Sequence, residues 1–398
     1  MMSDWKECTI GEIASVKGGK RLPKGVNLIT EQNAHPYIRI RDLTEKTLEL
    51  KSSYEYVDNE TQKCISRYIV CTGDILISIV GTIGLVAVVG ESLNGANLTE
   101  NCVKLIDIRE DVDREYLYYF LVSNMGQDEI RKGTVGAVQP KLPIKNIQSI
   151  KLYLPHIDIQ KRISGLLSAI DCKIAQNTAI NENLEQQAQA LFKAWFVDFE
   201  PFGGVMPEDW RTGSLSEICG YSKDKVNIED LTLDTYYSTE NMQTNRQGAV
   251  QATTLPTIKQ TTACKKGDVL ISNIRPYFKK IIYCFSDCGC STDVLCFVPN
   301  KSEYSAFLYC VLYSDKFFDY MVAGSKGTKM PRGDKQQIMM YPICIPSVEY
   351  IENFSKAVAP MLETVYTNRL EANNLATLRD TLLPKLMNGE IDVSQVWV

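Results

Sequence analysis

Gly73–Ser78 reads Gly-Asp-Ile-Leu-Ile-Ser, and Gly267–Ser272 repeats it as Gly-Asp-Val-Leu-Ile-Ser, 194 residues later. Flanking segments repeat too. The start Asp4-Trp5-Lys6 recurs as Asp209-Trp210-Arg211, 205 residues later, and Pro140 and Pro155 recur as Pro331 and Pro346, 191 residues later. A period near 200 residues far exceeds the roughly 20 to 50 residues of a solenoid unit. The chain therefore holds two similar globular modules, the second 14 residues shorter because the offset falls from 205 to 191.

Composition is that of an ordinary soluble protein. The 398 residues suffice for two or three domains, and 44% hydrophobic with 23% charged residues is a normal balance. No apolar run is long enough to span a bilayer, and the start Met1-Met2-Ser3-Asp4-Trp5-Lys6 lacks a signal-peptide core, which predicts a cytoplasmic protein. The odd count of 13 cysteines then indicates reduced thiols and not a disulfide framework.

Charge is unevenly distributed. The net charge is −5, but the segment from Arg246 to Lys280 holds seven basic residues and one acid, and the segment from Lys132 to Lys151 holds four lysines and no acid. Basic faces on an acidic body are typical of a protein that meets phosphate on one side. Ordinary solvated charge is the alternative interpretation.

Each module combines strands and helices. Short β-type runs punctuated by Gly, Asn and Pro fill residues 1–157 and 206–346. The clearest are Ile75–Ile79, Leu85–Val89, Val269–Ile271 and Lys280–Cys284. Helical stretches interrupt them at Arg114–Ser123 and Tyr304–Asp315. The pattern predicts an α+β fold.

Each module is followed by a long helical pattern, in 158–205 and 347–398. A heptad fits both, with apolar residues predominating at positions a and d. In the first helix, a is Ile163, Ile170, Asn177, Leu184 and Leu191, and d is Leu167, Ile174, Asn181, Ala188 and Trp195. In the second, a is Phe354, Met361, Asn368, Leu375 and Leu382, and d is Val358, Val365, Ala372, Arg379 and Leu386. Pro360 is expected to mark the start of the regular second helix.

Asn177 and Asn368 occupy the same central a position. If the two helices pack antiparallel around a pseudo-twofold axis, these side chains meet at the midpoint and fix the register at some cost in stability. Five heptads span roughly 50 Å, comparable with the roughly 34–36 Å between DNA half-sites one turn apart. The alternative is two separate amphipathic helices, each lying on its own module.

Catalytic motifs are missing. The two histidines, His35 and His156, lie in different settings, so neither a Ser-His-Asp triad nor a two-histidine metal site is expected. Gly19-Lys20-Arg21 lacks the spacing of a phosphate-binding Walker loop, and no Asn/Asp-Pro-Pro-aromatic methyltransferase motif occurs. Cys284, Cys288, Cys290 and Cys296 do not have the spacing of a zinc finger, which favours core or loop cysteines and no metal.

The ends of the long helices carry a family resemblance. Leu191–Pro201 and Arg379–Ile391, the latter containing Leu-Leu-Pro-Lys-Leu-Met-Asn-Gly-Glu-Ile, together with the repeated Gly-Asp-aliphatic-Leu-Ile-Ser strand, resemble the specificity subunit of type I restriction–modification systems over essentially the whole chain. The resemblance implies two target-recognition domains that read the halves of an asymmetric, bipartite site in double-stranded DNA. It also implies a helical spacer that docks two modification subunits, with restriction subunits joining them. The chain itself would be non-catalytic, with S-adenosylmethionine, ATP and Mg²⁺ on the partner subunits.

The expected architecture is therefore two α/β target-recognition domains, related by pseudo-twofold symmetry and separated by an antiparallel coiled coil. Their predicted bounds are 1–157 and 206–346, with helical regions at 158–205 and 347–398. A self-sufficient DNA-modifying enzyme and a DNA-free assembly adaptor are the competing functions. No membrane contact is expected.

DNA-contacting residues are expected on loops that offer Arg, Lys, Asn, Gln or Thr to bases or phosphate. The first group is Lys20 and Arg21, with Arg39 and Arg41 alternating on a strand with Ile38 and Ile40. The second is a Lys-Gly-Thr loop present in both modules, giving Lys132, Thr134, Gln139 and Lys141, then Lys326, Thr328, Lys329 and Arg332. The third is the segment after the repeated strand, with Asn273, Arg275, Tyr277 and Lys279. Plain connecting turns and solvated edge charges are the alternatives.

Overall fold

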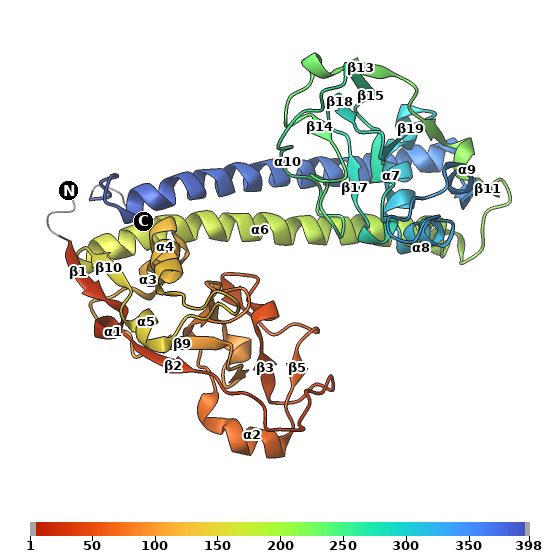
Figure 1. The fold of residues 1–398 in the computed structure, drawn as a ribbon. Helices are drawn as coiled ribbons and strands as arrows, with labels where there is room; N and C mark the ends of the chain where they lie inside the picture. Colours follow the sequence, from red (N-terminus) through yellow and green to blue (C-terminus); the bar gives the residue numbers. More distant parts are fainter. Residues whose placement is uncertain (1–4, 395–398) are drawn as a thin grey trace. The chain divides into compact units, whose positions relative to one another are not determined.

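The computed structural model describes residues 5–394, so Asp4, where the first copy of the repeat begins, lies outside the described residues. The chain divides into two compact units. Unit 1 comprises residues 1–172 and 376–398, and unit 2 comprises residues 173–375. Each unit therefore joins one sequence module to segments of both long helices (Figure 1).

Unit 1 is built on a five-stranded sheet with the order β2-β9-β6-β7-β4. Its strands are β2 (Ser15–Gly18), β9 (Cys102–Ile106), β6 (Ile75–Ser78), β7 (Val86–Val89) and β4 (Thr47–Leu48). A three-stranded sheet, β5-β3-β8, contains Glu55–Tyr56, Pro36–Ile38 and Asn97–Leu98, and β1 (Lys6–Thr9) pairs with β10 (Lys151–Leu154). The helices are α1 (Ile10–Ile13), α2 (Asn59–Ile65), α3 (Arg114–Val122), α4 (Asn124–Gly133) and α5 (Ile144–Gln148).

Unit 2 repeats this plan. Its four-stranded sheet has the order β12-β19-β16-β17, with Cys219–Tyr221, Val294–Pro299, Val269–Ser272 and Ile281–Tyr283. A second sheet, β13-β15-β18-β14, holds Lys225–Asn227, Gln260–Cys264, Cys288–Cys290 and Tyr236–Tyr237, and β11 (Arg211–Ser214) pairs with β20 (Pro342–Ile345). The helices are α7 (Ser305–Tyr313), α8 (Asp315–Ala323) and α9 (Lys335–Met339). The clearest strands and helices expected from the sequence are confirmed. Both modules place the Gly-Asp strand between two antiparallel neighbours, but the second sheet has the order β5-β3-β8 in unit 1 and β13-β15-β18-β14 in unit 2.

The Gly-Asp pair before each central strand forms the tight turn that leads into the strand. Gly73 and Gly267 adopt positive φ angles of 83° and 94°, in the region that favours glycine. The following carboxylates close the turn, because Asp74 accepts from the Cys71 amide at 2.9 Å and Asp268 from the Lys265 amide at 2.7 Å. The strands they lead into are buried at every residue, so the run is uniformly apolar and does not alternate.

The long helices are α6 (Ile157–Phe196) and α10 (Val348–Met387). Within unit 1, Arg162 donates to the Val393 carbonyl and Asp171 contacts Arg379. Within unit 2, Asn177 contacts Glu371 and Phe196 packs against Phe354. Higher numbers on α6 meet lower numbers on α10 in both units, so the antiparallel pairing expected from the heptads is confirmed in each.

Pro360 does not mark the start of the second helix. The helix begins at Val348, twelve residues earlier, and continues through the proline. A proline inside a helix costs about 3 kcal/mol because it lacks an amide donor and its ring crowds the preceding turn. Phe354 and Val358 are fully buried in the unit 2 core, and this packing holds the turns before Pro360 helical.

Candidate nucleic-acid interface

Two of the predicted basic segments meet in unit 2. Lys326 and Arg332 close a hairpin loop by reciprocal backbone hydrogen bonds of 2.9 and 3.0 Å, and Gly327 at its turn has a φ of 105°. The loop is joined to the segment after β16, because the Arg275 amide donates to the Pro331 carbonyl at 2.8 Å and Ile274 forms a bridge with Arg332. The structure thus assembles one surface from segments more than 50 residues apart in sequence.

The segment after β16 has a constrained backbone. Arg275 and Lys279 both adopt left-handed conformations, with φ of 50° and 51°, on either side of a 3₁₀ turn at Pro276–Phe278. Such conformations are uncommon for non-glycine residues and occur preferentially at functional sites. Tyr277 at the turn is 48% exposed, whereas Asn273 is only 7% exposed and lies beneath the loop.

Unit 1 contains the same loop. Val135 and Lys141 exchange backbone hydrogen bonds of 2.9 Å each, and Gly136 has a φ of 95°. Lys141 also bridges to Val80, just after β6, and the Leu142 amide donates to the Ile79 carbonyl at 3.0 Å. Gln139 and Lys141 lie on this loop, and both are exposed.

The prediction that the two Lys-Gly-Thr sequences form equivalent loops was wrong. Lys132 and Gly133 end helix α4, and Thr134 caps it by donating its hydroxyl to the Ile130 carbonyl at 2.8 Å. In unit 2 the residue that corresponds to Thr134 is Ser325, whose hydroxyl donates to the Val322 carbonyl, three residues earlier, at 2.7 Å. Lys326-Gly327-Thr328 instead begins the hairpin and corresponds to Val135-Gly136-Ala137. The sequence match is shifted by three residues because the shared backbone motif is the hairpin and not the tripeptide.

Ion pairs partly neutralise the cations of unit 2. Lys326 pairs with Asp334 at 2.7 Å, Arg332 with Asp293 at 2.9 Å, and Lys279 with Asp315 at 2.6 Å. Arg246 also pairs with Asp315, and the hydrogen bonds from Arg246 and Lys279 lower the pKa of that carboxyl to about 2. Thr328 and Lys329 are exposed, and within residues 5–394 Lys329 takes part in none of the ion pairs.

The remaining predicted cations of unit 1 lie elsewhere. Lys20 sits 5.5 Å from the ring centre of Tyr68, and Arg21 pairs with Glu100 at 2.8 Å. Lys132 pairs with Glu129 within α4 at 2.7 Å. None of these contacts involves the Val135–Lys141 hairpin.

Arg39 and Arg41 do not alternate on a strand as expected. Strand β3 ends at Ile38, and Ile40–Asp42 forms a 3₁₀ turn that Arg39 precedes. The Asp42 carboxylate accepts from the Arg39 amide at 2.7 Å and so favours a turn over an extended strand. Both arginines then reach the same carboxylate, Glu55.

The heptad asparagines form a ladder in unit 2. The Asn177 amide group donates to the Asn368 carbonyl at 3.3 Å and to Glu371 Oε2 at 2.8 Å. The Asn368 side chain donates to Asn181 Oδ1 at 2.9 Å, and Asn181 in turn donates to the Val365 carbonyl at 3.3 Å. Asn177 is fully buried, and its Oδ1 has no hydrogen-bond partner among residues 5–394.

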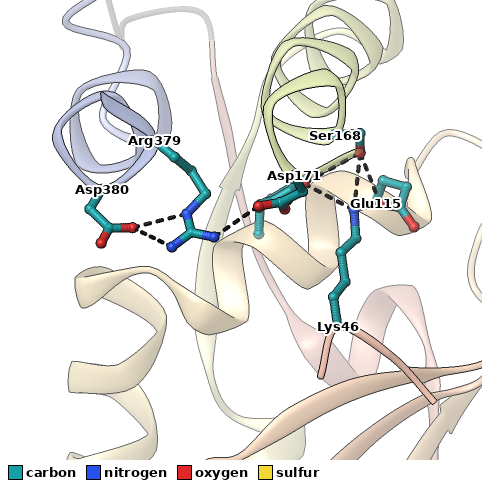
Figure 2. A network of polar contacts seen from close by, with 7 residues as sticks. Lys46, Glu115, Ser168, Asp171, Arg379 and Asp380 are labelled. Atoms are coloured by element: carbon teal, nitrogen blue, oxygen red, sulfur yellow. Dashed lines mark hydrogen bonds and ion pairs between the residues drawn. The ribbon is translucent and has the colours of Figure 1, made fainter. Parts of the chain in front are cut away.

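Charged residues join the helices in both units. In unit 2, Glu185 of α6 pairs with Arg369 of α10 at 2.7 Å, and burial raises the pKa of the Glu185 carboxyl despite this partner. In unit 1, Asp171 of α6 pairs with Arg379 of α10 at 2.8 Å. Figure 2 shows this second pair and the residues around it.

The unit 1 pair belongs to a network that reaches the sheet. Asp171 accepts from the Tyr119 hydroxyl at 2.5 Å, and Lys46 donates to the same hydroxyl at 2.9 Å and to Ser168 at 3.0 Å. Lys46 also pairs with Glu115 at 2.5 Å (Figure 2). Burial and the Asp171 contact raise the pKa of Tyr119, which keeps the phenol protonated as a donor. No sequence pattern predicted this network, and the one signal for it was a charged residue, Arg379, at a heptad d position.

The cysteines are packed in the core of unit 2. Cys264, Cys284, Cys288, Cys290 and Cys296 are all buried in one cluster, where the Cys284 and Cys288 sulfurs lie 3.6 Å apart. Among the described residues no group of three or more Cys, His, Asp or Glu side chains is arranged to hold a metal ion. No helix in residues 5–394 is both long and apolar enough to cross a membrane.

Comparison with known proteins agrees with the repeated architecture. The specificity subunit of the type I restriction enzyme HindI from Haemophilus influenzae is 24% identical, with 98% of this chain and 100% of that protein aligned. The MjaIX specificity subunit from Methanocaldococcus jannaschii is also 24% identical, over 99% and 95% of the two chains. A crystal structure of a type I S subunit from M. genitalium has a similar fold, with a TM-score of 0.64, 18% identity and 96% of each chain covered.

The family model for the type I restriction modification DNA specificity domain matches twice, at residues 2–186 and 207–379. The two matches follow the internal repeat and together cover most of the chain. This protein therefore belongs to the type I restriction modification DNA specificity domain family.

Proposed function

We propose that this chain is the non-catalytic DNA-recognition subunit of a cytoplasmic type I restriction–modification complex. The observation that carries the proposal is the matched loop pair. Each unit presents a hairpin loop, Val135–Lys141 or Lys326–Arg332, against the segment after its central strand. The backbone is the same in both units and the side chains differ. Two domains with similar folds and different surface side chains are suited to bind the two unlike halves of a bipartite DNA site.

The positive charge of the two joined loops of unit 2 supports double-stranded DNA as the ligand. Arg275, Lys326, Lys329 and Arg332 lie on two joined loops, and B-DNA carries one negative charge per about 1.7 Å of its axis. Guanidinium and amide side chains there can also reach base edges in the major groove. The candidate residues of unit 1 are Gln139 and Lys141 on the hairpin, with Lys20 and Arg21 as additional phosphate contacts.

The paired helices are proposed to set the distance between the half-sites and to dock two modification subunits, which restriction subunits then join. Family membership supports this role, as do the antiparallel contacts of α6 and α10 within each unit. Adenine methylation with S-adenosylmethionine, and ATP- and Mg²⁺-dependent cleavage, would belong to the partner subunits.

Mapping of adenine methylation across the genome, in cells with and without this gene, tests the proposal. The expected result is one bipartite motif with two different halves that loses its methylation when the gene is removed. An unchanged methylation map in cells that express the modification subunit would contradict it. Methyl transfer by the purified chain with S-adenosylmethionine alone would instead favour a self-sufficient enzyme.

A further inference from the structure

The hairpin loops of the two units can be compared residue by residue. Each is closed by the same backbone pair, each turns on a glycine with positive φ, and each is followed by an amide that donates to the segment after the central strand. With the closing pairs aligned, Val138 at the tip of the unit 1 hairpin corresponds to Lys329 at the tip of the unit 2 hairpin. Because the two hairpins are closed by the same backbone hydrogen bonds, their tips differ in side-chain chemistry.

The tip of the unit 1 hairpin is apolar. Val138 is 94% exposed, the highest value among the large apolar side chains of the described residues, and Val135 beside it is 50% exposed. The adjoining segment after β6, from residue 79 to residue 85, contains no charged residue. Lys141 is the one cation of this loop pair. Val138 at this exposure contributes little to the core of unit 1, and its position on a closed loop leaves its side chain available for contact with a ligand.

The tip of the unit 2 hairpin is cationic. Six basic residues lie on this loop pair, namely Arg275, Lys279, Lys280, Lys326, Lys329 and Arg332. Three acids pair with members of the group, namely Asp293, Asp315 and Asp334. The surface keeps a net positive charge, with Lys329 outside the ion pairs.

We infer that this shared tip position contacts bases through Val138 in unit 1 and phosphate through Lys329 in unit 2. The inference rests on the proposed function and adds that the two units use this loop position for different kinds of DNA contact. A valine cannot bind phosphate, but it can contact a thymine methyl group or a base step. An ammonium group binds phosphate irrespective of sequence, and each such contact adds about 0.9 to the slope of log K against log[salt].

Two single variants test the inference in the complex assembled with modification subunits. Binding is measured over a salt series on the mapped target duplex and on duplexes altered at one base pair at a time. Lys329→Ala should weaken binding by a similar factor on every duplex and reduce the salt slope by about 0.9. Val138→Ala should leave the slope unchanged and reduce discrimination at one position by roughly five- to tenfold, as expected for loss of a small apolar contact.

Lys301→Ala and Val205→Ala are the matched controls, because both residues are exposed and lie outside the loop pairs. Neither should change the slope or the discrimination. An unchanged slope in Lys329→Ala, or unchanged discrimination at every base pair in Val138→Ala, would overturn the inference. The proposed function fails separately, if the complex with the wild-type chain shows no preferred duplex at any salt concentration.

Discussion

Arg379 of α10 donates from Nη1 to Oδ1 of Asp171 of α6 over 2.8 Å, across the interface between the two helices of unit 1. The Asp171 carboxylate also accepts from Tyr119 of α3 at 2.5 Å, and Lys46 holds Tyr119 from the sheet side. One carboxylate therefore connects both helices to the module that packs on them. If the module reads DNA, as proposed, this connection would keep its loops in a constant orientation to the helices of unit 1.

Replacing Arg379 should destabilise unit 1. Arg379→Ala leaves Asp171, whose side chain is 19% exposed, without its cation, and we expect a loss of about 1–3 kcal/mol in the free energy of unfolding. Urea unfolding followed by circular dichroism measures the change. Asp380→Ala is the control, since Asp380 pairs with the same arginine but is 66% exposed; it should cost less than about 0.5 kcal/mol. Equal losses in the two variants would show that the Asp171 pair contributes no more than a surface contact.

The ion pairs of Asp315 should give unit 2 an acid-dependent stability. Hydrogen bonds from Arg246 and Lys279 lower the pKa of Asp315 from its ordinary value near 3.8 to about 2. A lowered pKa means that the ionised carboxylate stabilises the fold above about pH 4, and that this contribution is lost as the pH falls towards about 2. The side chain is 67% exposed, so the effect should stay below about 1 kcal/mol.

Comparison of the wild type with Asp315→Asn in urea at pH 5, 4 and 3 checks this expectation. The wild type should be the more stable at pH 5, and the difference should shrink as the pH falls, because the asparagine does not titrate. Glu303→Gln serves as the control: Glu303 is exposed and makes no ion pair within the described residues. A difference that grows towards pH 3 would contradict the assigned sign.

Periodic features of the fold could be predicted from sequence. The repeated Gly-Asp strand identified the central strand of each sheet, because a positive-φ glycine and a turn-closing carboxylate depend only on residues nearby in the chain. The heptads identified the buried faces of α6 and α10 in the same way. Turn-forming residues and a repeated heptad spacing can both be recognised in a single sequence.

Features set by tertiary packing could not be predicted. Lys46 and Arg379 enter one network although they are more than 300 residues apart, and no spacing rule connects them. Pro360 suggested a helix start, but burial of the turns before it outweighed the local penalty. The Lys-Gly-Thr repeat was misleading because identical tripeptides lie at the end of a helix in one unit and in a hairpin in the other.

The buried Asn177 should lower the stability of the protein while specifying the alignment of the helices. Asn177 is fully buried and its Oδ1 has no hydrogen-bond partner among residues 5–394, so Asn177→Leu should raise the free energy of unfolding by about 1 kcal/mol. Asn368→Ala should have the opposite sign, because it removes the donor to Asn181 Oδ1. Thermal melting measures both, with the exposed Asn183→Leu as control. If Asn177→Leu melts at a lower temperature than the wild type, Asn177 stabilises the protein. That result would contradict the proposal that it fixes the helix register at a cost in stability.

If the helices set the separation of the half-sites, as proposed, shortening both should shorten the spacer of the DNA target. Deleting Asn177–Asn183 from α6 together with Val365–Glu371 from α10 removes one heptad from each, including the asparagines that contact one another. Seven helical residues span about 10 Å, so the spacer between the methylated half-sites should shrink by about three base pairs while both half-site sequences stay the same. Deleting the α6 heptad alone is the control: it mismatches the two helices and should abolish methylation. A double deletion that still methylates sites with the original spacer would show that something other than helix length fixes the distance, since the loops proposed to contact DNA are untouched by the change.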